Sequence, residues 1–146
     1  QRAGDQPARD LHPRERDHIN SATWYCTALL ALALTMSPMA CSLAVIVLAI
    51  GDPAAAFIGR RWGRLRLASG RSLEGALAFL AFASLAAFAT LRLFYPELAL
   101  NETVAVAVGA AAAGAIAELV TVSLDDNLVI PLAAAAGASL VAAVFG

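Results

Sequence analysis

Long stretches without charged residues alternate with short polar segments along the chain. Residues 19–51, 75–91, 103–117 and 127–146 contain no Asp, Glu, Lys, Arg or His. A helix that crosses a bilayer needs about 20 mostly apolar residues, with a lower limit near 17. The first stretch is too long for one span and the third is short for one, so we expect flanking residues to complete some spans. The pattern predicts an all-α, polytopic membrane helix bundle of about five transmembrane helices.

Proline positions divide these stretches into helices. Ser37-Pro38 interrupts the first stretch and Tyr95-Pro96 ends the third helix, because proline fits the start of a helix better than its interior. At Gly51-Asp52-Pro53 we expect the second helix to break or kink, since Asp is a good N-cap and Pro a good first residue. The predicted helices cover residues 19–36, 38–51 with a continuation through 58, 74–94, 102–120 and 128–144, with a basic loop at 60–73.

Composition supports a membrane class. Hydrophobic residues make up 60% of the chain and charged residues 14%, whereas soluble domains carry about 25% charged residues. A soluble bundle would need helices with a polar outer face, and residues 27–50 and 127–146 show none. We expect a polar segment at 1–17 and one membrane-embedded domain at 18–146. The chain begins at Gln1 and its first segment is no signal peptide, which suits a piece that lacks earlier helices.

The arginines predict the orientation. Five of the ten basic residues share one short segment: Arg60, Arg61, Arg64, Arg66 and Arg71. The positive-inside bias places such a segment in the cytoplasm. Counting helices from there puts Arg14, Arg16 and the turn at residues 125–127 on the same side. The Ser37-Pro38 junction and the turn at 96–101 fall on the other side, so we expect an integral membrane protein whose polar site faces the cytoplasm.

Asp52 and Glu118 each end a long uncharged stretch. A carboxylate within a membrane span is costly and usually functional. Asp52 precedes Arg60 by eight residues, about 12 Å of helical rise, and Glu118 precedes Asp125 by seven, which would keep both near one side of a helix. The alternatives are an N-cap before Pro53 and an interfacial residue at a helix end.

Residues 59–75 combine five arginines with four glycines. Arginine binds phosphate oxygens through two nitrogens at once, glycine lets backbone N–H groups approach, and a helix that starts at Ser72 would favour an anion. The alternative is a basic patch on anionic lipid headgroups. No Walker loop is present. The candidate phosphate-binding residues are Arg60, Gly63, Arg64, Arg71, Ser72, Glu74 and Gly75.

Asp125-Asp126-Asn127 forms a compact acidic turn. Proteins usually bind Mg²⁺ through one or two carboxylates, together with water and substrate phosphates. The turn is therefore a candidate metal site, and the alternative is helix capping by Asp and Asn.

Three segments occur in an order that resembles a known family. They are residues 51–60 (GDPAAAFIGR), residues 70–75 (GRSLEG), and Ala117-Glu118 followed by Asp125-Asp126-Asn127-Leu128 and Pro131-Leu132. Together they resemble the CTP-dependent polyprenol and lipid kinases, which include dolichol kinase, phytol kinase and the CTP-using diacylglycerol kinase. The resemblance covers about residues 14–132. Arg71 stands where this family usually has Lys in a G-K-S-x-E-G pattern, and family members usually carry additional N-terminal helices.

The resemblance implies transfer of the γ-phosphoryl group of CTP to a lipid or isoprenoid alcohol. It implies phosphate binding by Arg60, Arg64 and Arg71, and Mg²⁺ binding by Asp125 and Asp126. Asp52 or Glu118 would be a further metal ligand or the base that accepts the alcohol proton. The expected partners are CTP, the alcohol and membrane lipids, without nucleic acid.

Two other functions stay open. Residues 52–75 also look like one block of phosphatidate cytidylyltransferase, which forms a CDP-lipid, but the later K-D…P-G-H-G-G stretch is missing. A small membrane protein that only binds anionic lipid would need no catalytic acids. The sequence leaves the alcohol and the oligomeric state open.

Overall fold

The computed structural model describes residues 20–67, 69–121 and 124–145. It contains five α-helices, which are α1 Ser21–Thr35, α2 Pro38–Trp62, α3 Leu73–Phe94, α4 Leu100–Val120 and α5 Asp126–Phe145. In these ranges the β-pairing consists of one isolated bridge between Arg66 and Ser72. The predicted all-α helical bundle is confirmed.

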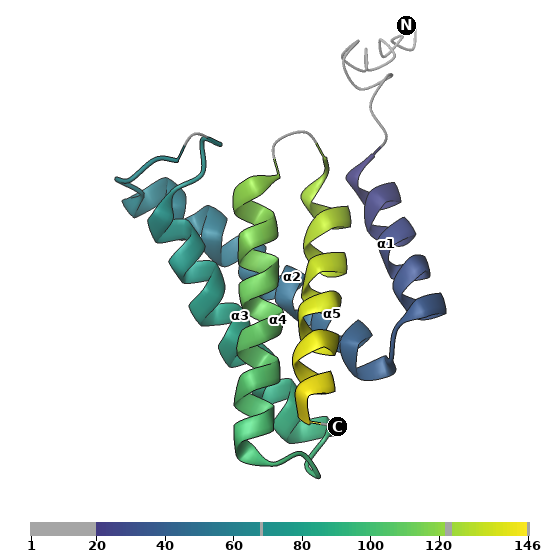
Figure 1. Cartoon of the computed structure of the whole chain (residues 1–146). Helices are drawn as coiled ribbons and strands as arrows, with labels where there is room; N and C mark the ends of the chain where they lie inside the picture. Colours follow the sequence, from purple (N-terminus) through teal and green to yellow (C-terminus); the bar gives the residue numbers. More distant parts are fainter. Residues whose placement is uncertain (1–19, 68, 122–123, 146) are drawn as a thin grey trace, which may run out of the picture.

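The helices form a bundle with two different ends (Figure 1). Helices α3, α4 and α5 lie side by side, α2 crosses behind them, and α1 lies beside α5. The start of α1, the loop after α2 and the start of α5 share one end, which we call the polar end. The turn between α3 and α4 lies at the other end. The predicted grouping of the basic loop and the acidic turn is therefore present in the fold.

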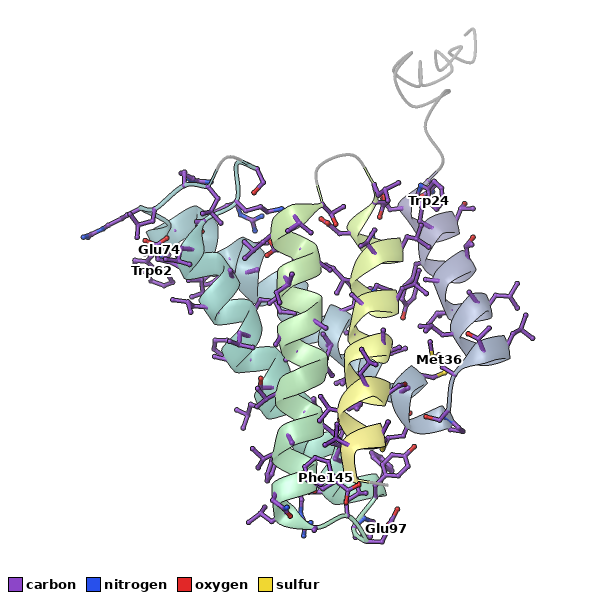
Figure 2. The ribbon with its side chains drawn as sticks, viewed as in Figure 1. Trp24, Met36, Trp62, Glu74, Glu97 and Phe145 are labelled. Carbon is purple, nitrogen blue, oxygen red and sulfur yellow. The ribbon has the colours of Figure 1, made fainter. Side chains whose placement is uncertain are left out.

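Four of the helices are long and apolar enough to cross a membrane, namely α2, α3, α4 and α5. Helix α1 has only 15 residues and rises about 22 Å, short of the roughly 30 Å of a hydrocarbon core. Figure 2 accordingly shows Met36, at the end of α1, well short of the level of Glu97. The expectation that the Ser37-Pro38 junction reaches the far side is wrong, because α1 is too short.

Side chains of large apolar residues cover the outside of the bundle, as a lipid-facing surface requires. Leu34, Leu93 and Val144 are each more than 70% exposed. Inside, Phe79 is fully buried, and its ring occupies space that glycines leave free. A Cβ atom at Gly51 would lie 2.6 Å from the Phe79 ring, and one at Gly114 would lie 3.2 Å from it. Small residues thus let α2 and α4 close on one large side chain of α3.

Helix α2 runs without interruption through Gly51, Asp52 and Pro53. The predicted break is wrong. Gly51 and Ala55 are buried on either side of the proline, so packing holds this segment helical. Proline removes its own donor and its ring crowds the carbonyl four residues earlier, but neither effect interrupts this helix. The helix also continues to Trp62, so Arg60 and Arg61 belong to its last turn and the loop is shorter than predicted.

Candidate functional site at the polar end

The close approach of α2 and α3 builds the floor of the site. Ser72 is the N-cap of α3, and its hydroxyl accepts a hydrogen bond of 3.1 Å from the backbone N–H of Gly75. A Cβ atom at Gly75 would lie 2.9 Å from the Ala55 carbonyl oxygen, and one at Gly63 would lie 2.7 Å from the Ser72 side chain. Three residues that were predicted to bind phosphate therefore have a packing role. Tight contacts at Gly63, Ser72 and Gly75 hold the backbones of α2 and α3 close together.

The loop between α2 and α3 is a small hairpin. The backbone N–H of Leu67 donates to the Arg71 carbonyl at 2.8 Å, and Gly70 at the tip has a φ of +82°, a value that favours glycine. Glu74 fixes the loop from the side, because its carboxylate accepts backbone N–H bonds from Arg64 and Leu65. Glu74 thus holds the hairpin in place, and it does not line the pocket described next.

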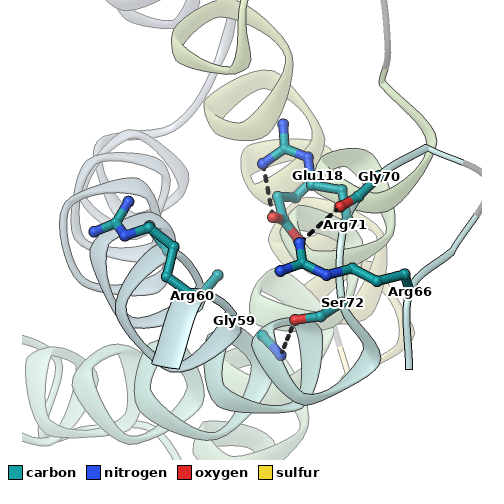
Figure 3. Close-up of a pocket in the computed structure, with 10 residues that line it drawn as sticks. Gly59, Arg60, Arg66, Gly70, Arg71, Ser72 and Glu118 are labelled. Atoms are coloured by element: carbon teal, nitrogen blue, oxygen red, sulfur yellow. Dashed lines mark hydrogen bonds and ion pairs between the residues drawn. The ribbon is translucent and has the colours of Figure 1, made fainter. Parts of the chain in front are cut away.

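A pocket of about 120 Å³ opens between the hairpin and the ends of α2 and α4. Figure 3 shows the residues that line it, including Arg66, whose Nη1 donates to the Gly70 carbonyl at 3.1 Å. Among the predicted phosphate ligands, Arg60 and Arg71 line this pocket, whereas Arg64 is exposed outside it. The lining residues are Ala55, Ala56, Gly59, Arg60, Arg66, Gly70, Arg71, Ser72, Gly75 and Glu118.

Arg71 joins three parts of the bundle. Its Nη1 atom donates to Oε1 of Glu118 in α4 at 2.8 Å, and its Nη2 atom donates to Oδ2 of Asp126 at the start of α5. Burial disfavours the charged form of Arg71, but the two carboxylates outweigh that effect and raise its pKa above the usual value. The guanidinium stays protonated and ties α3, α4 and α5 together.

Negative charge is in excess around this guanidinium. Asp52 interacts electrostatically with Arg71 and Asp126, so three carboxylates share the neighbourhood of one paired arginine. Glu118 is 97% buried, and its Oε2 atom has no hydrogen-bond partner; the same holds for the buried Oδ1 atom of Asp126. Arg60 interacts with Asp52 as well, so the cluster sets three carboxylates against two guanidinium groups. The two oxygens without a hydrogen-bond partner remain unsatisfied, and a buried unsatisfied oxygen favours a ligand that can bind it.

Two of these carboxylates are of the donor type that Mg²⁺ takes. Within the described parts of the chain, no three Asp, Glu, His or Cys side chains are close enough to hold a metal on protein ligands alone. Mg²⁺ usually takes one or two carboxylates and completes its shell with water and phosphate oxygens. The unpartnered oxygens of Glu118 and Asp126 provide those two carboxylates beside the arginine-lined pocket.

Asp125 has a different environment from Asp126. Its carboxylate accepts hydrogen bonds from the Ser21 hydroxyl at 2.6 Å and from the backbone and side-chain nitrogens of Asn127 at 2.9 Å. Burial acts to raise the pKa of Asp125, but these bonds outweigh it and lower the pKa below its usual value. Asp125 therefore joins α1 to the start of α5, and its interactions are those of a capping residue.

The expectation that Glu118 and Asp125 share one side of a helix is wrong. Helix α4 ends at Val120, so Asp125 lies beyond its end. Asp126 meets Glu118 instead, through Arg71. The sequence did not predict Arg66 as a pocket residue. Its place in the lining depends on the pairing of Arg66 with Ser72 across the hairpin. Arg14 and Arg16 lie outside the described residues.

Comparisons with protein-family models, curated proteins and solved structures found no match to this chain, and no family is assigned to it on that basis.

Proposed function

We propose that this chain transfers the γ-phosphoryl group of a nucleoside triphosphate to the hydroxyl group of a lipid or isoprenoid alcohol. The observation that supports this most is the pair of carboxylate oxygens, one of Glu118 and one of Asp126, that have no hydrogen-bond partner next to a pocket lined by arginine and glycine. Phosphoryl transfer requires positioning and charge neutralisation more than covalent chemistry by the protein. CTP is the proposed nucleotide because of the motif resemblance.

The pocket suits the phosphates of the nucleotide. Its volume is about 120 Å³. Arg60 and Arg66 would bind phosphate oxygens through paired N–H groups. Ser72 and Gly75, at the start of α3, also line this space. The nucleoside would then extend from the polar end towards the aqueous side.

Glu118 and Asp126 would hold Mg²⁺ through their free oxygens. When bound, Mg²⁺ neutralises charge that develops on the transferred phosphoryl group. Asp52, which stands beside these residues on α2, would accept the proton of the alcohol hydroxyl. The alcohol oxygen then bonds to the γ-phosphorus as the bond to the bridging oxygen breaks. The products are a lipid monophosphate and a nucleoside diphosphate.

An apolar acceptor explains why such an enzyme would be embedded in a membrane. Four helices of this chain are long enough to span a bilayer, and the proposed site lies at one end of them. A lipid alcohol keeps its tail among apolar helices while its hydroxyl reaches the interface. The phosphates of the nucleotide would reach the site from the aqueous side, at the same depth as this hydroxyl.

The products decide between this proposal and its alternatives. Purified protein would be given CTP, Mg²⁺ and a panel of lipid alcohols, and the products identified by mass. We expect CDP and a lipid monophosphate. Pyrophosphate and a CMP-bearing lipid would instead identify a cytidylyltransferase. Equal, weak binding of CTP, ATP and sulfate, without dependence on Mg²⁺, would indicate a simple basic patch.

A further inference from the structure

A second, larger cavity has Asp52, the proposed proton acceptor, among its lining residues. It has a volume of about 260 Å³ and lies between α1, α2 and α5. Most of its wall is apolar, but one carboxylate faces it, that of Asp52. The lining residues are Tyr25, Leu48, Ala49, Asp52, Pro53 and Asn127.

Two prolines make this cavity rich in hydrogen-bond acceptors. Pro53 lies inside α2 and Pro131 inside α5. Because proline has no N–H, Pro53 cannot donate to the carbonyl of Ala49, nor Pro131 to that of Asn127, in the usual pattern four residues back. Ala49 and Asn127 both line the cavity. These two carbonyls lack their usual helical donor, and the Asp52 carboxylate is a third acceptor among the lining residues. The cavity therefore suits a ligand that carries a hydroxyl group.

The two cavities follow one face of α2. Leu48 and Asp52 line the larger cavity, and Ala55 and Gly59 line the phosphate pocket. Their spacing of four, three and four residues places them on one side of a helix. Asp52 and Ala56 are four residues apart, about 6 Å along the axis. A hydroxyl beside Asp52 would thus lie about one helical turn along α2 from the phosphate pocket.

The cavity is accessible from the side. Helix α1 packs mainly on α5 and touches α2 only weakly, and the two helices diverge from their junction towards the polar end (Figure 1). Ala49 and Pro53 are exposed on α2. A ligand can therefore approach from the bilayer between α1 and α2, without passing through the aqueous end.

We propose that this cavity receives the hydroxyl end of the acceptor, a lipid alcohol that enters between α1 and α2 and places its oxygen beside Asp52. This inference rests on the proposed phosphotransferase function, whose acceptor it locates. An apolar cavity of about 150 Å³ is large enough to bind benzene, so 260 Å³ accommodates a hydroxyl and the first carbons of a chain. Tyr25 and Asn127 supply donors for the alcohol oxygen.

Filling the cavity tests the proposal through kinetics. Ala49→Trp places a large ring in the cavity, and Ala81→Trp makes the same change on an exposed position of α3 that lines neither cavity. For Ala49→Trp we expect the KM for the alcohol to rise at least tenfold, with the affinity for CTP and Mg²⁺ within twofold of the wild type. Ala81→Trp should change neither. An unchanged KM in a folded Ala49→Trp protein would overturn the subsite while leaving the phosphotransferase function intact.

Crosslinking tests the subsite without catalysis. The probes are an isoprenoid alcohol and a diacylglycerol, each with a diazirine next to the hydroxyl-bearing carbon, applied to the full chain in lipid nanodiscs. We expect one probe to label α1 near Tyr25 and α2 near Ala49, with competition by its unlabelled alcohol and not by the matching hydrocarbon. The probe that labels identifies the acceptor type. Labelling by neither, or equal competition by the hydrocarbon, would overturn the subsite. Labelling in a protein that phosphorylates no alcohol would support the subsite and reject the kinase function.

Discussion

At the scale of single residues, Arg71 makes a contact that lysine could not reproduce. Its two terminal nitrogens reach Glu118 and Asp126 separately, which needs the fork of a guanidinium. The resembled family usually has lysine here, which offers a single nitrogen. Arginine at this position therefore links α4 to α5. This link is separate from any role of its positive charge in binding phosphate.

The first prediction concerns this link. Arg71→Ala leaves the buried Glu118 without its partner, and we expect the free energy of unfolding to fall by about 2 kcal/mol. That lies below the roughly 3–5 kcal/mol of a fully buried pair, because the Arg71 side chain is 28% exposed. Adding Glu118→Gln should recover part of the loss, since it removes the unpaired charge. Unfolding in detergent by denaturant measures both. If the double variant is less stable than Arg71→Ala, the charge argument is wrong.

The second prediction separates two adjacent carboxylates. Asp126→Asn removes a free anionic oxygen at the proposed metal site, and we expect turnover to fall at least 100-fold, about 2.7 kcal/mol in activation free energy. The fold should be retained. Asp125→Asn is the matched control, because the Asp125 carboxylate bonds Ser21 and Asn127 and not Arg71. It should loosen α1 with little effect on turnover at saturating substrate. Normal turnover in Asp126→Asn would mean that this carboxylate binds no catalytic metal.

At the scale of the helices, α4 and α5 meet along a seam of very small residues. A Cβ atom at Gly137 would lie 2.6 Å from the Ala113 side chain and 2.7 Å from the Gly109 carbonyl oxygen. Backbone atoms cannot move aside cheaply, so the distance between these helices depends on glycine. Small residues are the usual means of close helix packing in lipid. This seam also sets the spacing of Glu118 and Asp126, which lie at the adjoining ends of the two helices.

The third prediction follows from that seam. Gly137→Leu should force α4 and α5 apart and lower the free energy of unfolding by at least about 2 kcal/mol, in the range of overpacked cores. Ala143→Leu makes a comparable enlargement on an exposed position of the same helix and should be nearly neutral. The thermal midpoints of the two variants in one detergent give the comparison. Equal midpoints would show that the helices can separate at little cost.

The helices themselves could be predicted from the sequence, because charge-free stretches and a few prolines are local signals. The ends of α3 and α4 were predicted to within two residues. The break at Pro53 was predicted wrongly, since the packing of Gly51 and Ala55 outweighs one lost hydrogen bond. The contact of Arg71 with Glu118 and Asp126 could not be predicted. Glu118 lies 47 positions and Asp126 lies 55 positions after Arg71 in the sequence, and only the packing of three helices brings them together.

At the scale of the whole molecule, the fold groups the arginine hairpin and the start of α5 at one end, with the α3–α4 turn at the other. The fourth prediction tests this in a membrane. The native Cys26 and Cys41 would first be removed. One cysteine at a time would then be introduced at an exposed position, Leu67, Leu124 or Asn101. We expect Leu67→Cys and Leu124→Cys to react with a membrane-impermeant maleimide from the cytoplasmic side, and Asn101→Cys from the other. Labelling of Leu67→Cys and Leu124→Cys from opposite sides would exclude a shared site.

The short length of α1 also bears on how the chain enters the membrane during synthesis. A helix of 15 residues is below the length at which a segment integrates stably on its own. Helix α1 should therefore wait at the translocon until α2 has emerged, and the two should integrate as one hairpin. Arginines at the end of α2 and in the hairpin would then hold that end of the pair on the cytoplasmic side. Shortening α2 should accordingly expel α1 from the bilayer as well.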